Sequence, residues 1–130
     1  MKVSAKSQYG LRALTYIAKL QRICSLKEIA AKEAISFDYL EKILSQLEKD
    51  KIIKSKLGTK GGYQLNKPAD KIKMIDVINA LDSQLISIQC LQSKNTCPRN
   101  NKCQAQALWK MLEKHLSQFL SKTTLKDLIK

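Results

Sequence analysis

Residue types that enzymes and membrane-spanning proteins depend on are scarce in this chain. Among its 130 residues there is one histidine, and aromatic residues make up only 5%. The chain has no glycine-rich nucleotide-binding motif and no Ser-His-Asp or Cys-His set, which argues against an enzyme. No apolar run approaches the ~18 residues needed to cross a bilayer. We therefore expect neither an enzyme nor a membrane protein.

Acidic residues are also few, which leaves a large positive charge. Asp and Glu number 11 against 24 Lys and Arg, so the net charge is +13. Residues 1–66 carry 13 Lys and Arg against 6 Asp and Glu, and residues 67–130 carry 11 against 5. A charge spread in this way indicates a polyanionic partner, with nucleic acid first and an anionic membrane second. A soluble protein that is merely lysine-rich is the alternative.

The cysteines and the N-terminal residues bear on the compartment. Lys2 and Lys6 are followed by polar residues rather than by an apolar stretch, so we expect no secretory signal and a cytoplasmic protein. In a reducing compartment, clustered cysteines are more often metal ligands or redox sensors than structural disulfides. Cys24 stands alone beside Ile23 and Leu26, and we expect it to be a small buried side chain.

Apolar spacing in the first 50 residues predicts three helices. The first spans Ser7 to Leu20, the second opens at the Ser25–Glu28 capping box and runs through about Lys32, and Ser36 caps the third. The third helix has one apolar face and one polar face. Its apolar stripe is Leu40, Ile43, Leu44 and Leu47, and its polar face is Phe37, Asp38, Glu41, Lys42, Ser45 and Lys49. Two short helices of this kind predict a helix-turn-helix.

A basic β-hairpin is predicted directly after these helices. Its strands are Lys51–Lys56 and Tyr63–Asn66, and the tip between them holds three of the four glycines of the protein. Glycine permits positive φ, which lets such a tip approach a phosphate backbone. The fold class expected is therefore mainly α with a small β-hairpin wing, that is, a winged helix-turn-helix. A plain surface hairpin is the alternative.

The second half of the chain is predicted to hold two further helices and a loop. A short helix spans Ile72 to Leu81 and rests on Ile75, Ile78 and Leu81. A helix of about 18 residues follows Cys103, and its long apolar stripe suggests pairing with a second copy of the chain. A terminal turn is expected at Leu125–Ile129. The expected domains are 1–82 for DNA binding, 83–104 for the cysteine loop, and 105–130 for the dimerisation helix and C-terminal turn.

Three cysteines mark the loop as the candidate metal site. Cys90, Cys97 and Cys103 have the spacing Cys-x6-Cys-x5-Cys. Three thiolates suit an iron–sulfur cluster, while zinc and redox-active thiols remain alternatives. The one histidine, His115, lies twelve residues past Cys103, about 18 Å along a helix, and is a poor ligand for the same site.

Taken together, these segments resemble a known family. The helix-turn-helix, the Ser55–Tyr63 wing, the three-cysteine loop, the long helix and Thr123–Leu128 are similar to the Rrf family of bacterial winged-helix repressors, in its IscR-, NsrR- and RirA-like iron–sulfur branch. The resemblance implies a homodimer on a pseudo-palindromic operator in double-stranded DNA. It further implies a recognition helix in the major groove, a wing in the minor groove, and a [2Fe-2S] or [4Fe-4S] cluster on the three cysteines.

The resemblance also implies which residues bind DNA and which complete the metal site. The expected DNA contacts are Ser36, Asp38, Tyr39, Glu41, Lys42, Lys56, Thr59, Lys60 and Tyr63. Gln106 stands where IscR-type members have a histidine ligand, and Gln8 stands where NsrR-type members use an acidic residue of the other subunit. The sequence therefore supplies three thiolates and no obvious fourth ligand, and Gln106 and Gln8 of the partner subunit are the candidates for that position. Leu57 replaces an arginine that many members carry before the first wing glycine.

The function that follows is a repressor that senses iron–sulfur, redox or nitric oxide status through a cluster on the three cysteines. One alternative is a winged-helix regulator whose cysteines act as a thiol switch or zinc site without a cluster. A small redox enzyme or electron carrier is a further alternative, which the missing nucleotide-binding and catalytic motifs disfavour.

Overall fold

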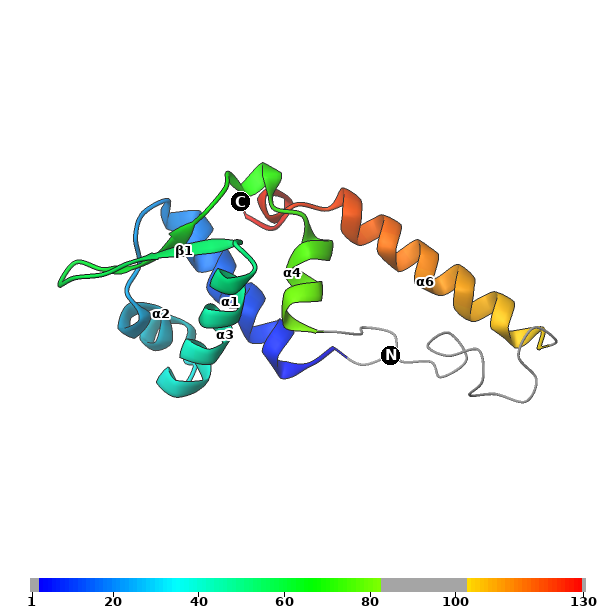
Figure 1. The fold of residues 1–130 in the computed structure, drawn as a ribbon, viewed down its shortest axis with the longest axis horizontal. Helices are drawn as coiled ribbons and strands as arrows, with labels where there is room; N and C mark the ends of the chain where they lie inside the picture. The colour runs from blue at the N-terminus through cyan, green and yellow to red at the C-terminus, as the bar shows by residue number, and fades with distance from the viewer. Residues whose placement is uncertain (1–2, 83–102, 130) are drawn as a thin grey trace.

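Helices dominate the computed structural model, which describes residues 3–82 and 103–129. The elements in order are α1 Ala5–Leu20, α2 Leu26–Glu33, α3 Phe37–Lys49, β1 Ile53–Lys56, β2 Gly62–Leu65, η1 Ala69–Lys71, α4 Met74–Leu81, α6 Ala105–Lys122 and η2 Leu125–Leu128, where η marks a 3-10 helix. β1 and β2 form one antiparallel hairpin (Figure 1). The expected fold class, mainly helical with a small wing, is confirmed. No helix of the described residues is long and apolar enough to cross a membrane.

Serine caps fix where the first three helices begin. Ser4, Ser25 and Ser36 each accept a hydrogen bond on the side chain from the backbone N–H three residues later. Such a cap satisfies one of the N–H groups that a helix leaves unpaired at its start. Since Ser4 is the first of these caps, α1 begins at Ala5, and the expected start at Ser7 was wrong. The caps at Ser25 and Ser36 are confirmed.

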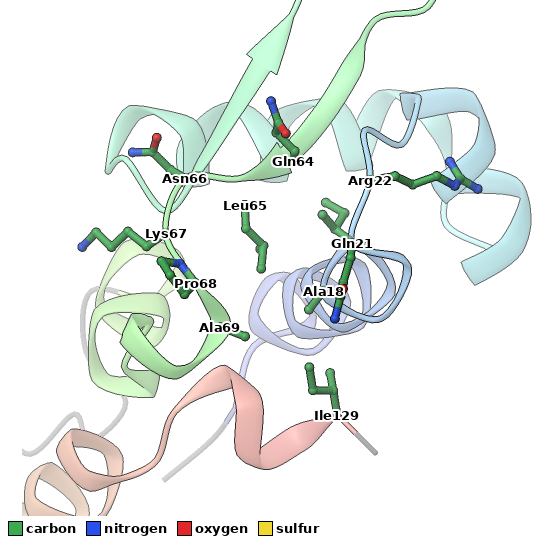
Figure 2. Close-up of a pocket in the computed structure, with 11 residues that line it drawn as sticks. Ala18, Gln21, Arg22, Gln64, Leu65, Asn66, Lys67, Pro68, Ala69 and Ile129 are labelled. Atoms are coloured by element: carbon green, nitrogen blue, oxygen red, sulfur yellow. The ribbon is translucent and has the colours of Figure 1, made fainter.

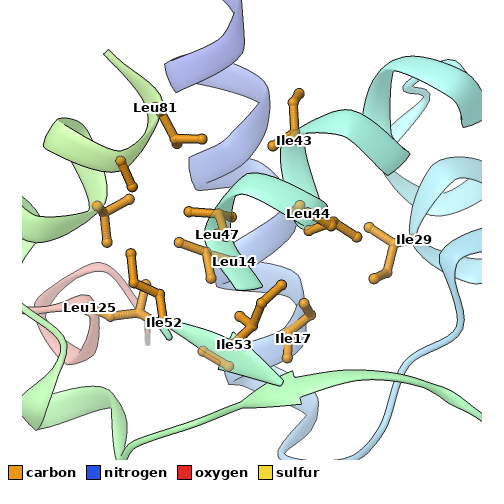
Figure 3. Packing of buried hydrophobic residues seen from close by; sticks show 14 of the residues in the cluster. Leu14, Ile17, Ile29, Ile43, Leu44, Leu47, Ile52, Ile53, Leu81 and Leu125 are labelled. Carbon is orange, nitrogen blue, oxygen red and sulfur yellow. The ribbon is translucent and has the colours of Figure 1, made fainter. Parts of the chain in front are cut away.

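The core lies among α1, α3 and α4, which face one another across a set of aliphatic side chains (Figure 3). The largest fully buried aliphatic side chains of this core are Leu14, Ile17, Ile29, Leu40, Ile43, Leu44, Leu47, Ile53, Val77 and Leu125. The predicted stripe of α3 is therefore confirmed as its buried face. Gly10 lets α1 and α4 approach closely, because a Cβ there would lie 2.4 Å from Cδ1 of Leu81.

The hairpin begins later than expected because α3 ends late. Lys51 has φ 63°, and its N–H donates to the Glu48 carbonyl at 2.9 Å, so this residue still closes the helix. Pairing then runs from Ile53 opposite Leu65 to Lys56 opposite Gly62. The strands are thus Ile53–Lys56 and Gly62–Leu65, which corrects the expected Lys51–Lys56 and Tyr63–Asn66. In Figure 1 the hairpin projects to one side of the helices.

The C-terminal segment explains why α4 begins at Met74 and not at Ile72. The Met74 N–H donates to the Thr123 carbonyl at 2.8 Å, and the Leu125 N–H donates to the Ile72 carbonyl at 2.9 Å. Ile72 is held extended by this pairing and cannot join the helix. The helix therefore buries Met74, Val77, Ile78, Ala80 and Leu81. Ile75, expected in the core, is only half-buried.

The long helix α6 has the 18 residues expected and spans about 27 Å. Its C-terminal end lies beside α4 (Figure 1). Its N-terminal end is the part farthest from α1 to α4 and the hairpin, which together are called the winged domain below. After α6 the chain returns to the core through η2, where Thr124 and Asp127 form a capping box and Leu125 is fully buried. The expected terminal turn is confirmed, although η2 ends at Leu128.

Candidate nucleic-acid interface and cysteine site

The turn between α2 and α3 presents the outer face of α3 to solvent. Ala34 adopts the left-handed conformation with φ 53°, and Ile35 is buried beneath the turn. Ser36 then starts α3, whose inner stripe is fixed in the core. The opposite face, including Asp38, Glu41 and Lys42, is exposed as a consequence.

The five expected DNA contacts on α3 differ in their surroundings. Ser36, Asp38, Glu41 and Lys42 are exposed, and the Ser36 hydroxyl already accepts from the Tyr39 N–H at 3.3 Å. Tyr39 is half-buried, with its ring edge-on to Tyr9 at a centroid distance of 5.7 Å. Tyr39 therefore packs α3 against α1. The 49% exposure of Phe37 adds an apolar side chain at the start of this polar face.

The wing presents exposed lysines and no acidic side chain. Lys56, Thr59 and Lys60 are exposed, as are Lys54 and Leu57. From residue 51 to residue 69 the chain contains five lysines and no acidic residue. Cationic side chains with no neighbouring carboxylate on the same hairpin are suited to phosphate contact.

Tyr63 joins the base of the wing to the helices. Its backbone exchanges two hydrogen bonds with Cys24, at 2.9 and 2.8 Å. Burial raises the pKa of Tyr63, and Glu48 and Glu41 raise it further. The ring therefore stays uncharged near the acidic side chains of α3. Structurally, Tyr63 fixes the wing to the α1–α2 connection, whereas Lys56, Thr59 and Lys60 are exposed and lie where a partner can reach them.

A second set of contacts near the base of the wing joins residues that no local sequence pattern groups together. Arg22 donates two hydrogen bonds to Glu28, at 3.1 and 2.9 Å, and Tyr16 donates to the same carboxylate at 2.7 Å. The hydrogen bonds from Arg22 and then Tyr16 hold the pKa of Glu28 below its usual range. Cys24 lies beneath this cluster, fully buried, and burial raises the pKa of its thiol. The expected burial of Cys24 is confirmed.

A pocket of about 500 Å³ lies between the end of α1, β2, η1 and η2 (Figure 2). Ala18, Leu65, Ala69 and Ile129 surround the hollow in the view, and Arg22 lines it from the segment leading to α2. None of the expected DNA-binding or metal-binding residues lines it. The candidate interface is instead the exposed face of α3 together with the wing. Protruding elements of this kind suit a nucleic acid, because its grooves receive them.

Only part of the expected cysteine site falls in the described residues. Cys90 and Cys97 lie outside them. Cys103 is a half-exposed free thiol just before α6, and its carbonyl accepts from the Gln106 N–H at 3.2 Å. Within residues 3–82 and 103–129, no group of three or more His, Cys, Asp or Glu side chains is arranged to hold a metal.

The candidate fourth ligands lie in contrasting environments. Gln106 is 7% exposed and already has an interaction partner in the chain. Gln8 is exposed on α1, where its side-chain amide donates to the Val3 carbonyl at 3.2 Å. His115 is exposed, and its Nδ1 lies 2.7 Å from the Met111 carbonyl oxygen on its own helix. Of the two glutamines, Gln8 is the one open to another subunit.

Asp82, the last described residue before the cysteine segment (residues 83–104), is held to the start of α1. Its Oδ2 accepts from the Ser4 hydroxyl at 2.8 Å, the Ser7 hydroxyl at 2.7 Å and the Ser4 N–H at 3.3 Å. Ser7 is fully buried. The carboxylate therefore sits at the N-terminus of α1, where the helix dipole also favours negative charge. Since Asp82 is 75 or more residues from its partners, no local pattern could have revealed this contact.

Comparison with known proteins identifies the family to which this architecture belongs. Residues 3–130 match the Rrf2 family, described as an iron-dependent transcriptional regulator. The chain belongs to the Rrf2 family. Rrf2 members are transcriptional regulators and not enzymes, so the expected family and the expected lack of enzymatic activity are both confirmed.

Individual Rrf2 relatives are similar over nearly the whole chain. Protein rrf2 of Nitratidesulfovibrio vulgaris is 36% identical over 132 residues, covering 100% of this chain and 88% of that protein. The HTH-type transcriptional regulator IscR of Klebsiella pneumoniae is 34% identical over 131 residues, covering 99% and 80%. The structure of CymR, the global cysteine regulator of B. subtilis, matches with a TM-score of 0.79 at 30% identity, covering 98% of this chain and 95% of CymR.

Proposed function

We propose that this chain is a homodimeric repressor in the cytoplasm that binds a pseudo-palindromic operator and senses iron–sulfur, redox or nitric oxide status. Residues 1–82 read DNA, residues 83–104 carry the sensing cysteines, and residues 105–130 form the dimer. The proposal extends the family assignment, which makes the chain a transcriptional regulator.

The observation that carries DNA binding is that the polar face of α3 and the basic wing are both exposed. On α3, Glu41 and Lys42 are exposed side chains that can reach base edges, and a carboxylate accepts from the cytosine amino group in the major groove. On the wing, Lys56 and Lys60 supply phosphate attraction. Because Tyr63 fixes the base of the wing to the α1–α2 connection, the wing keeps a set position relative to the helices.

Support for the homodimer comes from the exposed apolar face of α6. Leu108, Met111 and Phe119 are 57%, 57% and 63% exposed, and they recur on one side of the helix. Such a stripe is costly to leave in water and is suited to packing against a second copy. Two subunits would place two copies of α3 on half-sites about one helical turn apart.

The donor set of the cysteine segment fits an iron–sulfur cluster. Cys90, Cys97 and Cys103 supply three thiolates, the ligand type that such clusters require, and Cys103 is accessible at the start of α6. A bound cluster would supply an iron centre that oxygen, nitric oxide or iron shortage can remove. Gln8 of the partner subunit and Gln106 remain the candidates for the fourth ligand.

The ends of the cysteine segment connect it to both other regions. At one end Asp82 is anchored to Ser4 and Ser7 on α1, and at the other end Cys103 leads directly into α6. Any restraint imposed between Cys90 and Cys103 therefore acts on the distance between the winged domain and the dimer helix. A change in that distance alters how two copies of α3 fit two half-sites, which is a means of changing operator affinity.

A second candidate keeps DNA binding but uses the cysteines as a thiol switch or a zinc site. The half-exposed free thiol of Cys103 favours it. Zinc is less well matched because structural zinc sites use four protein ligands, and three thiols are evident.

The test is the metal content of protein purified without oxygen, combined with duplex binding at rising salt. We expect iron and acid-labile sulfide, together with duplex affinity that falls steeply as salt increases. A colourless protein with zinc and no sulfide would support the second candidate. Protein that binds no duplex at any salt concentration would contradict both.

A further inference from the structure

Leu57 is the most exposed large apolar side chain of the described residues. It is 93% exposed, against 63% for Phe119. It stands at the start of the wing tip, between Lys56 and Gly58. Leucine in that setting contributes nothing to the core of this chain, so its position is informative about what the wing contacts.

The hairpin holds Leu57 at its tip by backbone constraints. Lys56 pairs with Gly62 in the last rung of the ladder, and the Gly61 N–H donates to the Gly58 carbonyl at 3.0 Å. A Cβ at Gly61 would lie 2.2 Å from the Lys56 carbonyl oxygen, so the tip closes tightly only with glycine there. Leu57 is therefore presented outward on a closed turn.

The charge around Leu57 selects the kind of partner. Lys54, Lys56 and Lys60 lie within three residues of it in the sequence, and no acidic residue occurs from residue 51 to residue 69. An apolar side chain with lysines nearby in the sequence is suited to a surface where apolar atoms lie between negatively charged groups. The minor groove of DNA is such a surface, since sugar and base edges lie between two rows of phosphates.

The reach of the hairpin agrees with that partner. Four paired residues span about 13 Å, and the tip adds several ångströms. Half a helical turn of DNA, the distance from a major groove to the adjacent minor groove, is about 17 Å. The minor groove is about 6 Å wide, which admits a single side chain but not a two-stranded ribbon. Leu57, at the start of the tip and 93% exposed, is a side chain of the size and exposure needed to enter it.

We propose that Leu57 enters the minor groove beside the recognition helix and selects A·T over G·C pairs there. This inference rests on the proposed DNA-binding function and deepens it. A guanine places its 2-amino group in the minor groove, where adenine has none. A leucine over that group meets it sterically and removes its hydrogen bond to water, whereas an A·T pair leaves room for the side chain.

The neighbouring lysines do not make this distinction. Lys56 and Lys60 have charged ends that are attracted to phosphates, which are the same in every sequence. Leu57 carries no charge and makes contacts only with what lies between the phosphates. Leu57 should therefore determine the preference for A·T pairs, and Lys56 and Lys60 should determine how steeply binding weakens with salt.

The test separates the two contributions with modified bases. Duplexes selected from a random library by the wild-type protein serve as probes, and each A·T pair is replaced in turn by G·C, by inosine·C, and by 2,6-diaminopurine·T. Inosine·C lacks the minor-groove amino group but has the major-groove edge of G·C. Diaminopurine·T adds that amino group and keeps the major-groove edge of A·T. The proteins compared are wild type, Leu57→Ala and Lys60→Ala.

At the base pair that Leu57 contacts, wild type should bind inosine·C as tightly as A·T. It should bind G·C and diaminopurine·T about fivefold more weakly, which is ~1 kcal/mol at 1.4 kcal/mol per factor of ten. Leu57→Ala should lose this preference and keep its salt dependence. Lys60→Ala should keep the preference and show a weaker dependence on salt, with a slope smaller by about one. Because Leu57 is exposed, the alanine variant should retain the wild-type circular dichroism and melting temperature.

Two results would overturn the inference while leaving DNA binding intact. One is a wild-type protein that selects duplexes but binds diaminopurine·T as well as A·T at every position. The other is a Leu57→Ala protein that retains the full preference. Failure of the wild-type protein to select any duplex would instead count against the proposed function itself.

Discussion

A single carboxylate, Asp82, connects the end of α4 to the start of α1. Three hydrogen bonds from Ser4 and Ser7 converge on one oxygen of this side chain. Burial by itself raises the pKa of Asp82, but the hydrogen bonds from Ser7 and Ser4, with Lys6 nearby, outweigh it and hold that pKa below its ordinary value. The charged form is therefore the one that the fold stabilises.

Replacing this carboxylate should weaken the domain in a pH-dependent way. Asp82→Asn should lower the free energy of unfolding at pH 7 by about 1–2 kcal/mol, because hydrogen bonds to a charged acceptor are lost. A depressed pKa means that the stabilisation is complete above the unfolded pKa of about 3.9 and is lost as pH falls through the folded value. The difference between wild type and variant in urea denaturation should therefore shrink below about pH 4.

Asp76→Asn supplies the matched control, since Asp76 is an exposed carboxylate on the same helix. It should change stability by less than about 0.5 kcal/mol. Equal losses for the two variants, or a loss at Asp82 that does not vary with pH, would show that the hydrogen-bonded carboxylate is not the stabilising group.

Which single residues could be predicted depended on the range of their contacts. The caps at Ser25 and Ser36 were predictable because the bond spans three residues, and the burial of Cys24 followed from its apolar neighbours. Asp82 was not predictable, because its partners lie 75 and 78 residues away. The same distance kept the half-burial of Ile75 from being foreseen, since the pairing of Ile72 with the C-terminal segment sets the start of α4.

Among the elements, the wing depends on a close approach at its base. Gly62 has φ +155°, and a Cβ there would lie 2.2 Å from the Cys24 carbonyl oxygen. The neighbouring residue Tyr63 makes the two backbone hydrogen bonds to Cys24. Only glycine allows the strand to lie this close to the α1–α2 connection, so this position fixes the direction of the wing.

Substitution at this glycine should therefore damage the wing more than substitution at its tip. Gly62→Ala should lower the free energy of unfolding by about 2–3 kcal/mol and speed amide exchange at Tyr63. Gly58→Ala is the comparison, because Gly58 also has positive φ, +117°, but a Cβ there would meet nothing within 4 Å. It should cost about 1 kcal/mol from backbone strain alone. A Gly62→Ala protein as stable as Gly58→Ala would contradict the close-packing explanation.

Element types were predictable from the sequence to a greater degree than element boundaries. The capped helices, the apolar stripe of α3 and the glycine-rich tip are local patterns, and each predicted the correct element. The first strand was placed two residues early because Lys51, a β-compatible residue by pattern, adopts φ 63° to close α3. That conformation depends on the Glu48 carbonyl and on packing, which residue types do not reveal.

For the whole molecule, α6 determines the expected assembly. Leu108, Met111 and Phe119 form an exposed apolar line on a helix that extends away from the winged domain (Figure 1). Among residues 3–82 and 103–129 this helix has few packing partners, since Gln106 is its one buried residue there. Pairing with a second copy would cover the line and set the separation of the two α3 helices.

Charge placed on this line should separate the subunits. Phe119→Glu should give a species of one chain mass in sedimentation equilibrium where wild type gives two, because a carboxylate is not tolerated unpaired in an apolar interface. Ser117→Glu, also exposed but roughly opposite Leu108 on the helix, should remain dimeric. If Phe119→Glu stays dimeric at the same concentrations, the subunits pair through another surface.

The sensing role could be inferred from the sequence only as far as the thiols. Three cysteines at this spacing indicated soft ligands, and Gln106 and Gln8 were named for the fourth position. The structure adds that Gln106 is buried and has a partner, while Gln8 is exposed on α1. A ligand from a second subunit cannot be predicted from one chain, because no sequence pattern encodes the relative placement of two copies.

We propose that cluster binding by Cys90, Cys97 and Cys103 is coupled to DNA binding. This coupling can be measured by comparing the affinity for DNA with and without the cluster. Protein purified without oxygen is assayed for iron and acid-labile sulfide, and its dissociation constant for a selected duplex is measured at fixed salt before and after the cluster is removed. We predict that iron and sulfide are present and that removal changes the dissociation constant about tenfold, within the usual range for coupled sites. Equal dissociation constants before and after removal, in protein shown to have contained the cluster, would contradict the account.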